Sequence, residues 1–305
     1  MLITESPVDS PTAVRASRLL RVLAWMSFVA ETLIIATGGA VRLTGSGLGC
    51  PTWPTCTPES LVATPEMGIH GIIEFGNRTL TGLVGILALA VVVLVWRLRR
   101  TRRDLFVLSL VVLGGVVAQA LVGGVTVLTG LNPFIVGFHY VASLILVCVC
   151  AAFLVRMDEP GGPRTRVVPA WFAGLTHLTT AVLAVTIAFG VLTTGAGPHS
   201  GDAASGRNGF DAEFLEHVHA WPGYILLALT VALTVIAWTR SLRPRQWFAA
   251  LLAVEVVQIA VGLYQARNGL PELAVGIHMV LAALTAAAMT VVILRLKTPA
   301  RIEIS

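Results

Sequence analysis

The sequence predicts an all-α integral membrane protein, in which eight transmembrane helices form two four-helix bundles related by tandem duplication. Three observations lead to this prediction: the composition, the number and length of the apolar runs, and an internal repeat. Of the 305 residues, 56% are hydrophobic and only 12% are charged. An ordinary soluble domain carries roughly 25% charged residues. This much apolar surface requires lipid as its solvent.

Eight apolar runs are each near or above the roughly 20 residues that a helix needs to cross a bilayer. In chain order they cover Leu19–Val41, Ile69–Trp96, Leu105–Thr129, Phe134–Val155, Val168–Thr194, Phe214–Trp238, Trp247–Ala266 and Leu273–Leu294. The first run is longer than the apolar core of a signal peptide, so we expect it to be retained as a span.

The loops between the runs support this division in order. A long loop, Arg42–Gly68, follows the first run, and a second long loop, Gly195–Glu213, follows the fifth. Between the fourth and fifth runs lies Met157–Val167, which is polar and rich in Pro and Gly and therefore marks a boundary. We expect an N-terminal bundle over residues 1–160 and a C-terminal bundle over residues 161–305.

The basic residues predict the orientation in the membrane. Of the 21 Lys and Arg residues, 17 lie in five segments. These segments are the one before the first run, the loops after the second, fourth and sixth runs, and the one after the eighth run. If every run crosses, all of these positions are on one side. By the positive-inside rule both termini are then cytoplasmic, in a multi-pass protein of the cell membrane. The formal charge of +5 is thereby explained by topology, which leaves little support for nucleic-acid binding.

An internal repeat indicates the duplication. The segment Gln119–His139 reappears as Gln258–His278, with the glutamine and the histidine 20 residues apart in both copies. Within this frame Gly123 corresponds to Gly262. Because each half has an even number of spans, both copies enter the membrane from the same side, which makes the repeat parallel. Each half is expected to be a four-helix bundle with room for a ligand between its helices.

Two histidines of the second half suggest a metal site. His219 lies near the outer end of the sixth run and His278 near the outer end of the eighth. Imidazoles from two facing helices can bind one heme iron axially. The alternative is that each histidine is a buried polar residue bonded to a carbonyl. Zinc would need a four-ligand cluster, which is missing, and the lack of a C-x-x-C-H motif implies a heme without a covalent link.

The second run carries a glutamate that admits two interpretations. His70 precedes Glu74 by four residues and Asn77 follows it by three, so the three side chains share one helix face. Glu74 would then belong to a functional polar face. Alternatively, it reaches toward the membrane surface and pairs with Arg78, one turn further on.

Two further glutamates, Glu31 and Glu255, lie deeper in the first and seventh runs. Each is either a proton relay or an interhelical hydrogen-bond partner.

The four cysteines fall into two pairs. Cys50 and Cys56 lie in the first outer loop, in the sequence C-P-T-W-P-T-C, where the compartment favours a disulfide. Such a bridge is either a structural link or a strained, redox-active bond. Cys148 and Cys150 in the fourth run are interpreted as small apolar residues.

The outer-loop motif resembles that of the heme A synthase family. The motif runs G-G-x-V-R-x-T-G-S-G-L-x-C-P over residues 38–51 and W-P-x-C over residues 53–56, and I-E-F-x-N-R follows over residues 73–78. The resemblance extends over all eight spans. It implies an eight-helix membrane oxidoreductase that acts on a CH3 group. Such an enzyme oxidises a ring methyl of heme O to the formyl group of heme A, for biogenesis of the terminal oxidase.

The resemblance also implies the heme ligands. His219 and His278 match the pair that holds heme b in the C-terminal bundle, and His139 matches a ligand of the substrate heme, heme O, in the N-terminal bundle. Asn77 stands where many members have a second histidine. We therefore expect the substrate heme iron to be held by His139 alone, with Asn77 beside it, since a neutral amide binds iron weakly.

Three other residues match catalytic positions of the family. Glu74 matches the catalytic glutamate, and Cys50 and Cys56 match a cysteine pair implicated in the reaction. The second outer loop lacks the further cysteine pair that some members carry there.

The implied partners are heme O and heme A, membrane lipid, a heme O synthase and the terminal oxidase; a homo-oligomer is compatible with the sequence, and nucleic acid is not expected. One alternative function is a non-enzymatic di-heme electron carrier of the b type, which gives no reason for the glutamate or the cysteine pair. Another is a transporter, which would need helices broken at mid-membrane.

Overall fold

The computed structural model describes residues 17–300, and most of these residues lie in helices. In this part of the chain the long helices are α1 (Arg18–Leu43), α2 (Gly68–Trp96), α3 (Arg103–Leu128), α4 (Pro133–Met157), α5 (Ala170–Ala196), α6 (Ala212–Thr239), α7 (Arg245–Arg267) and α8 (Glu272–Arg295). All 8 are long and apolar enough to cross a membrane, which confirms the predicted all-α membrane fold. The remaining elements are η1 (Pro65–Met67) and the short strands β1 (Arg164–Arg166) and β2 (Lys297–Pro299).

Polar residues just outside the apolar runs set several helix starts. Ser17 caps α1 by accepting a hydrogen bond from the Leu20 amide, and Asp211 caps α6 by accepting one from the Phe214 amide. Such caps satisfy amides that have no partner within the helix. Helix α6 therefore begins at Ala212, two residues before the start that hydropathy predicts, because the cap and first turn are polar.

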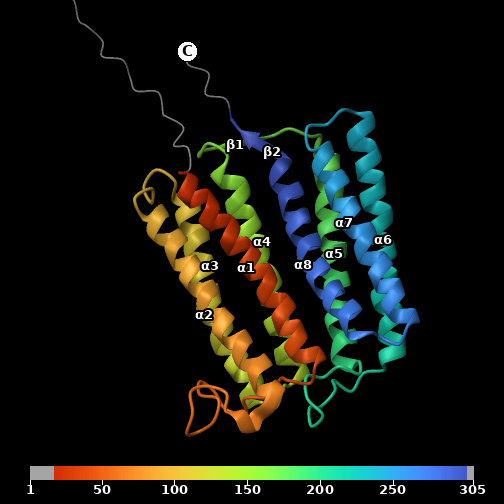
Figure 1. The fold of residues 1–305 in the computed structure, drawn as a ribbon. Coiled ribbons are helices and arrows are strands. Elements are labelled where there is room, and N and C mark those ends of the chain that lie inside the picture. The colour runs from red at the N-terminus through yellow and green to blue at the C-terminus, as the bar shows by residue number, and fades with distance from the viewer. Residues whose placement is uncertain (1–16, 301–305) are drawn as a thin grey trace, which may run out of the picture.

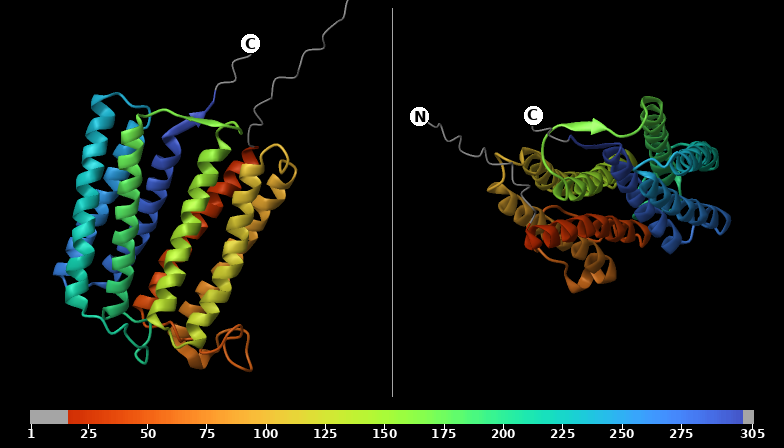
Figure 2. Two further views of the ribbon diagram at one scale, coloured as in Figure 1. Left: turned by 180° about the vertical axis from the view of Figure 1, so that it is seen from behind. Right: turned by 90° about the horizontal axis from the view of Figure 1, so that it is seen from above.

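The helices pack as two rings of four (Figures 1 and 2). In one ring α1, α2, α3 and α4 each contact the next and α4 contacts α1; in the other, α5, α6, α7 and α8 do the same. We call these the N-ring and the C-ring. This arrangement agrees with the predicted pair of four-helix bundles, while the duplication that would have produced it stays a prediction.

Helix α8 joins the rings, because it contacts both α1 and α4. Its alanines Ala283 and Ala287 pack in a buried cluster with Ile35 of α1 and Val147 of α4. Lipid tails are as apolar as these side chains, so helix association in a membrane depends on close packing, which small residues permit. The rings thus meet along the face of α8 that carries small side chains.

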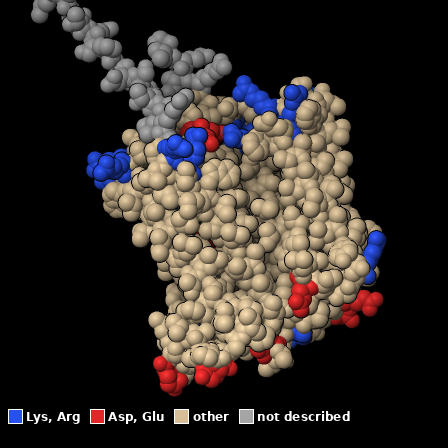
Figure 3. Space-filling view, in the orientation of Figure 1, with Lys and Arg blue, Asp and Glu red and all other residues tan. Residues whose placement is uncertain are grey.

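The charged side chains divide between the two ends of the molecule (Figure 3). Most Lys and Arg lie at the end where α1 begins and α8 finishes, and most Asp and Glu of this face lie at the opposite end. This distribution agrees with the predicted orientation, although the cytoplasmic location of the termini stays a prediction.

The linker between the rings is tied to the end of α8. Strand β1 pairs antiparallel with β2, and Glu159 forms ion pairs with both Arg164 and Arg295. The segment that the sequence marks as a boundary therefore also fastens the two rings together at the basic end.

Candidate functional site

One cavity of about 750 Å³ lies within the helices and is lined by residues of all eight. This volume is in the range of roughly 300–1,000 Å³ that is typical of ligand sites. Its lining is mostly apolar and includes all three histidines that the sequence predicts as ligands: His139 of α4, His219 of α6 and His278 of α8. The structure therefore brings together residues that the sequence places in separate halves.

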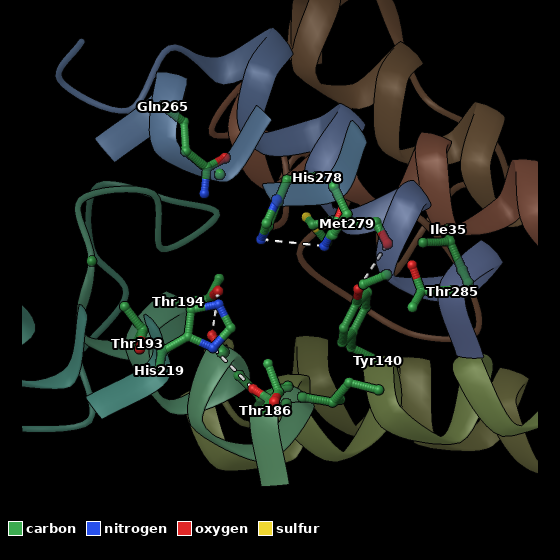
Figure 4. A pocket seen from close by; sticks show the side chains of 18 of the residues that line it. Ile35, Tyr140, Thr186, Thr193, Thr194, His219, Gln265, His278, Met279 and Thr285 are labelled. Carbon is green, nitrogen blue, oxygen red and sulfur yellow. Dashed lines mark hydrogen bonds between the residues drawn. The ribbon is translucent and has the colours of Figure 1, made fainter. Parts of the chain in front are cut away.

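In the C-ring, His219 and His278 face each other across the cavity (Figure 4). Their ring centroids are 6.3 Å apart and the ring planes are nearly perpendicular, at 86°. The Nδ1–H of His219 donates to the carbonyl of Thr186 at 2.9 Å, which leaves its Nε2 free to bind a metal. The Nδ1 of His278 is buried and has no hydrogen-bond partner, while its Nε2 lies 3.3 Å from the side-chain nitrogen of Gln258.

This geometry fits a heme iron held by two imidazoles. With metal–nitrogen bonds of roughly 2.0 Å on each side, a centroid separation of 6.3 Å is short enough for one metal atom to bond both rings. Among the residues that the structure describes, no group of three or more His, Cys, Asp or Glu side chains is arranged to hold a metal ion.

Two glycines make room for these imidazoles. A Cβ on Gly190 of α5 would lie 2.8 Å from Cε1 of His219, and a Cβ on Gly262 of α7 would lie 2.9 Å from Cε1 of His278. Both distances are shorter than real contacts, so a larger residue at either position would displace the imidazole. In the N-ring the equivalent of Gly262 is Gly123, where a Cβ would lie 3.5 Å from Cε1 of His139, an ordinary contact distance. The repeat therefore places a glycine beside a cavity histidine in both halves.

In the N-ring, His139 has an unengaged imidazole nitrogen. Its Nδ1 is buried and has no hydrogen-bond partner, while Gln119 donates to its backbone carbonyl at 2.7 Å. Asn77 also lines the cavity, but its Oδ1 accepts a hydrogen bond from Thr37 at 2.7 Å. The amide oxygen, the atom of Asn77 best able to bind a metal, thus already accepts one hydrogen bond, and a neutral amide binds iron weakly. These contacts suit one imidazole ligand in this ring.

Glu74 lies outside the cavity lining and is fully engaged. Its carboxylate is buried, with Oε1 accepting from Arg78 at 2.5 Å and Oε2 accepting from the Cys50 amide at 2.6 Å. Arg78 also donates to the carbonyls of Cys50, Thr52 and Thr55. Of the two interpretations left open by the sequence, the pair with Arg78 is the one observed. Its result is to hold the first outer loop against α2.

The predicted disulfide between Cys50 and Cys56 is confirmed. Both cysteines are completely buried, and Met67 lies 3.4 Å from the Cys56 sulfur. The loop packs closely on α2, since a Cβ on Gly49 would lie 2.3 Å from the His70 carbonyl.

The polar face predicted on α2 does not act as one unit. The His70 ring bonds Ser46 at 2.9 Å, Glu74 pairs with Arg78, and only Asn77 reaches the cavity. His70 is therefore not placed to bind a ligand beside His139.

Sequence reasoning missed Arg42 as a link between the rings. Its guanidinium donates to the carbonyl of His199 at 2.7 Å and to that of Thr194 at 2.8 Å. A signal was present, because Arg42 is one of only four basic residues outside the basic loops.

Comparison with known proteins gives consistent relatives. A 133-residue stretch is 38% identical to a protein named Heme A synthase from Lysinibacillus sphaericus, covering 41% of each chain. Proteins of the same name from Bacillus pumilus and Listeria monocytogenes are 36% identical over 159 residues and 27% identical over 155 residues. The first covers 50% of this chain and 48% of the relative, and the second covers 50% of each.

The chain thus spans about half the length of the curated relatives it matches. With its eight spans and these bacterial relatives, it is a multi-pass protein of the plasma membrane. A family model described as cytochrome oxidase assembly protein matches residues 21–199. Because this match takes in more than half of the 305 residues, the chain belongs to the COX15-CtaA family of cytochrome oxidase assembly proteins.

Proposed function

We propose that this chain is a membrane oxidoreductase that converts heme O to heme A, by oxidising a ring methyl to a formyl group for terminal oxidase biogenesis. The observation that carries this proposal is one cavity lined by three histidines, in a chain whose relatives are named Heme A synthase. A heme O synthase as supplier and the terminal oxidase as recipient are part of the proposal.

The two rings have different roles in this proposal. His219 and His278 hold heme b in the C-ring, and His139 holds the substrate heme in the N-ring. Heme supplies the redox chemistry, and the protein supplies binding, orientation and control of water. The Thr186 carbonyl fixes the His219 ring so that its Nε2 faces a ligand.

We assign Glu74 a positioning role. Its carboxylate holds the Cys50 amide and the Arg78 guanidinium, and so fixes the loop that carries the Cys50–Cys56 disulfide. The loop covers the outer end of α2, the helix that presents Asn77 to the cavity. Loss of Glu74 is therefore expected to affect the reaction through this loop.

The kinds of heme bound to the purified protein test this proposal. The protein is produced in a host that makes heme O, purified and extracted, and its hemes are separated by chromatography. We expect heme O and heme A beside heme b, and heme A only when His139 is intact. Heme b as the sole pigment, in a host shown to contain heme O, would contradict the proposal and favour the electron carrier.

A further inference from the structure

A buried acid in the N-ring is used by none of the contacts described above. Glu31 lies in the middle of α1, is only 2% exposed and lines the cavity. Its Oε1 has no hydrogen-bond partner, and no ion pair within residues 17–300 includes it. A buried polar group without a partner is costly unless a ligand or water completes it.

The other polar side chains of this part of the cavity are already paired. Gln119 donates to the His139 carbonyl and to Ser143, Tyr140 donates to the Met279 carbonyl, and Asn77 accepts from Thr37. On α1–α4 the buried side-chain atoms without a partner are therefore Oε1 of Glu31 and Nδ1 of His139. A ligand that completes this ring needs one group for the imidazole and another for the carboxyl.

The two groups lie at different depths. Glu31 is 12 residues from the outer end of α1 at Leu43, and His139 is six residues from the outer end of α4 at Pro133. At a rise of about 1.5 Å per residue, Glu31 lies about 9 Å further into the membrane. Val116, Leu146 and Thr81 line the cavity at a similar depth. The Thr81 hydroxyl already donates to the Asn77 carbonyl, so no polar side chain there pairs with the carboxyl oxygen.

We propose that Glu31 is the hydrogen-bond partner of a hydroxyl on a side chain of the substrate heme; this rests on the proposed function. Heme O differs from heme B by an alkyl chain that carries a hydroxyl on its first carbon, in place of a vinyl group. A neutral carboxyl can both donate to and accept from that hydroxyl. A vinyl group would leave the buried carboxyl unpaired, so Glu31 selects the hydroxylated heme.

The C-ring provides a contrast. Glu255 of α7 is also 2% exposed, lines the cavity and lies 12 residues from the outer end of its helix at Arg267. Around it, however, Thr230 and Gln258 also have buried atoms without partners. Several such atoms together suit ordered water, whereas the single carboxyl oxygen of the N-ring suits one hydroxyl. Glu255 is therefore the matched control.

The experiment uses two iron porphyrins that differ only by hydroxyls. Iron haematoporphyrin carries hydroxyethyl groups where iron mesoporphyrin carries ethyl groups. Each is titrated into purified full-length protein whose C-ring heme is loaded, and binding is followed by absorbance. The change that His139→Ala abolishes reports the N-ring site. We expect the unmutated protein to bind the hydroxyethyl compound about 10- to 100-fold more tightly.

Substitutions show which residue causes the preference for the hydroxyethyl porphyrin. Glu31→Leu should bind the two porphyrins equally, Glu31→Gln should keep part of the preference because an amide still forms hydrogen bonds, and Glu255→Leu should keep all of it. Equal binding by the unmutated protein, or an unchanged preference in Glu31→Leu, would overturn this inference alone. If neither porphyrin shows binding that depends on His139, the proposed substrate site fails as well.

Discussion

At the scale of single residues, the opposed imidazoles of the C-ring lead to the most direct prediction. His219 and His278 have ring centroids 6.3 Å apart, so removing either should leave a heme iron with one imidazole at most. We expect His219→Ala and His278→Ala each to abolish the low-spin bis-histidine absorption and paramagnetic resonance signals. His177→Ala, which removes an exposed histidine of α5, is the control. An unchanged low-spin signal in either cavity variant would refute the assignment.

The glycines behind these rings allow a finer test. In Gly190→Ala the new methyl would lie 2.8 Å from the His219 ring, and overpacking of this kind typically costs about 1–3 kcal/mol. We expect weaker heme b binding and a shifted spectrum. Gly174→Ala on the same helix, where nothing lies within 4 Å of the new methyl, should leave heme b binding unchanged. Equal effects of the two substitutions would show that the imidazole contact is unimportant.

A substitution of Glu74 distinguishes the effect of loop position on the reaction from the loading of heme b. In Glu74→Gln one of the two carboxylate oxygens that accept from Arg78 and Cys50 becomes an amide nitrogen, and a lost hydrogen bond to a charged group is worth about 1.5–3 kcal/mol. We expect heme A formation to stop while heme b still loads, as measured by chromatography of extracted heme. Glu66→Gln, an exposed acid just before α2, should be silent. A normal yield of heme A from Glu74→Gln would contradict the role.

These residues show how far the sequence could predict the site. The histidines were predictable because a duplicated frame and depth along a helix are linear features. The partners of Glu74 were only partly predictable: Arg78 is one helical turn away, but the Cys50 amide comes from a loop whose path depends on packing. Gly190 gave no signal, since its role is defined by a histidine 29 residues later on another helix.

At the scale of elements, the first outer loop can be tested by its thiols. In cells that produce a variant without Cys148 and Cys150, whose thiols are free, a thiol reagent added together with a denaturant should not label Cys50 or Cys56 until a reductant is added. The reason is the disulfide between them. Full labelling of both residues without reductant, in aerobically grown cells, would contradict it.

Helix ends and short strands were the elements least accessible to sequence reasoning. Hydropathy finds where a chain can sit in lipid, but α6 begins in a polar turn capped by Asp211, which hydropathy does not include. Strands β1 and β2 contain three residues each, and most of the C-terminal half of the sequence lies between these two paired strands. Nothing local marks such strands, because each exists only through the other.

At the scale of the whole molecule, the sequence predicted the two rings but not how they meet. Helix α8 is apolar on all sides, so its pattern does not show which face contacts α1 and α4. That contact depends on the position of Ala283 and Ala287 in three dimensions. The cavity shared by both rings follows from it, and a sequence divided into two domains could not have predicted it.

The two rings differ in the ligands that they offer to iron, and this difference predicts two different iron centres in one molecule. The C-ring offers two imidazoles as iron ligands. The N-ring offers the imidazole of His139 and the amide of Asn77, whose oxygen accepts a hydrogen bond from Thr37. The His70 ring is hydrogen-bonded to Ser46 outside the cavity. Substrate-loaded protein should therefore show a high-spin iron beside the low-spin C-ring centre. His139→Ala should lose the substrate heme and spare heme b, and Asn77→His should move the N-ring iron toward low spin because imidazole is the stronger ligand. Magnetic circular dichroism and paramagnetic resonance distinguish the two states. Two low-spin bis-histidine centres in the unmutated protein would overturn single ligation and would require His70 to leave Ser46 and enter the cavity.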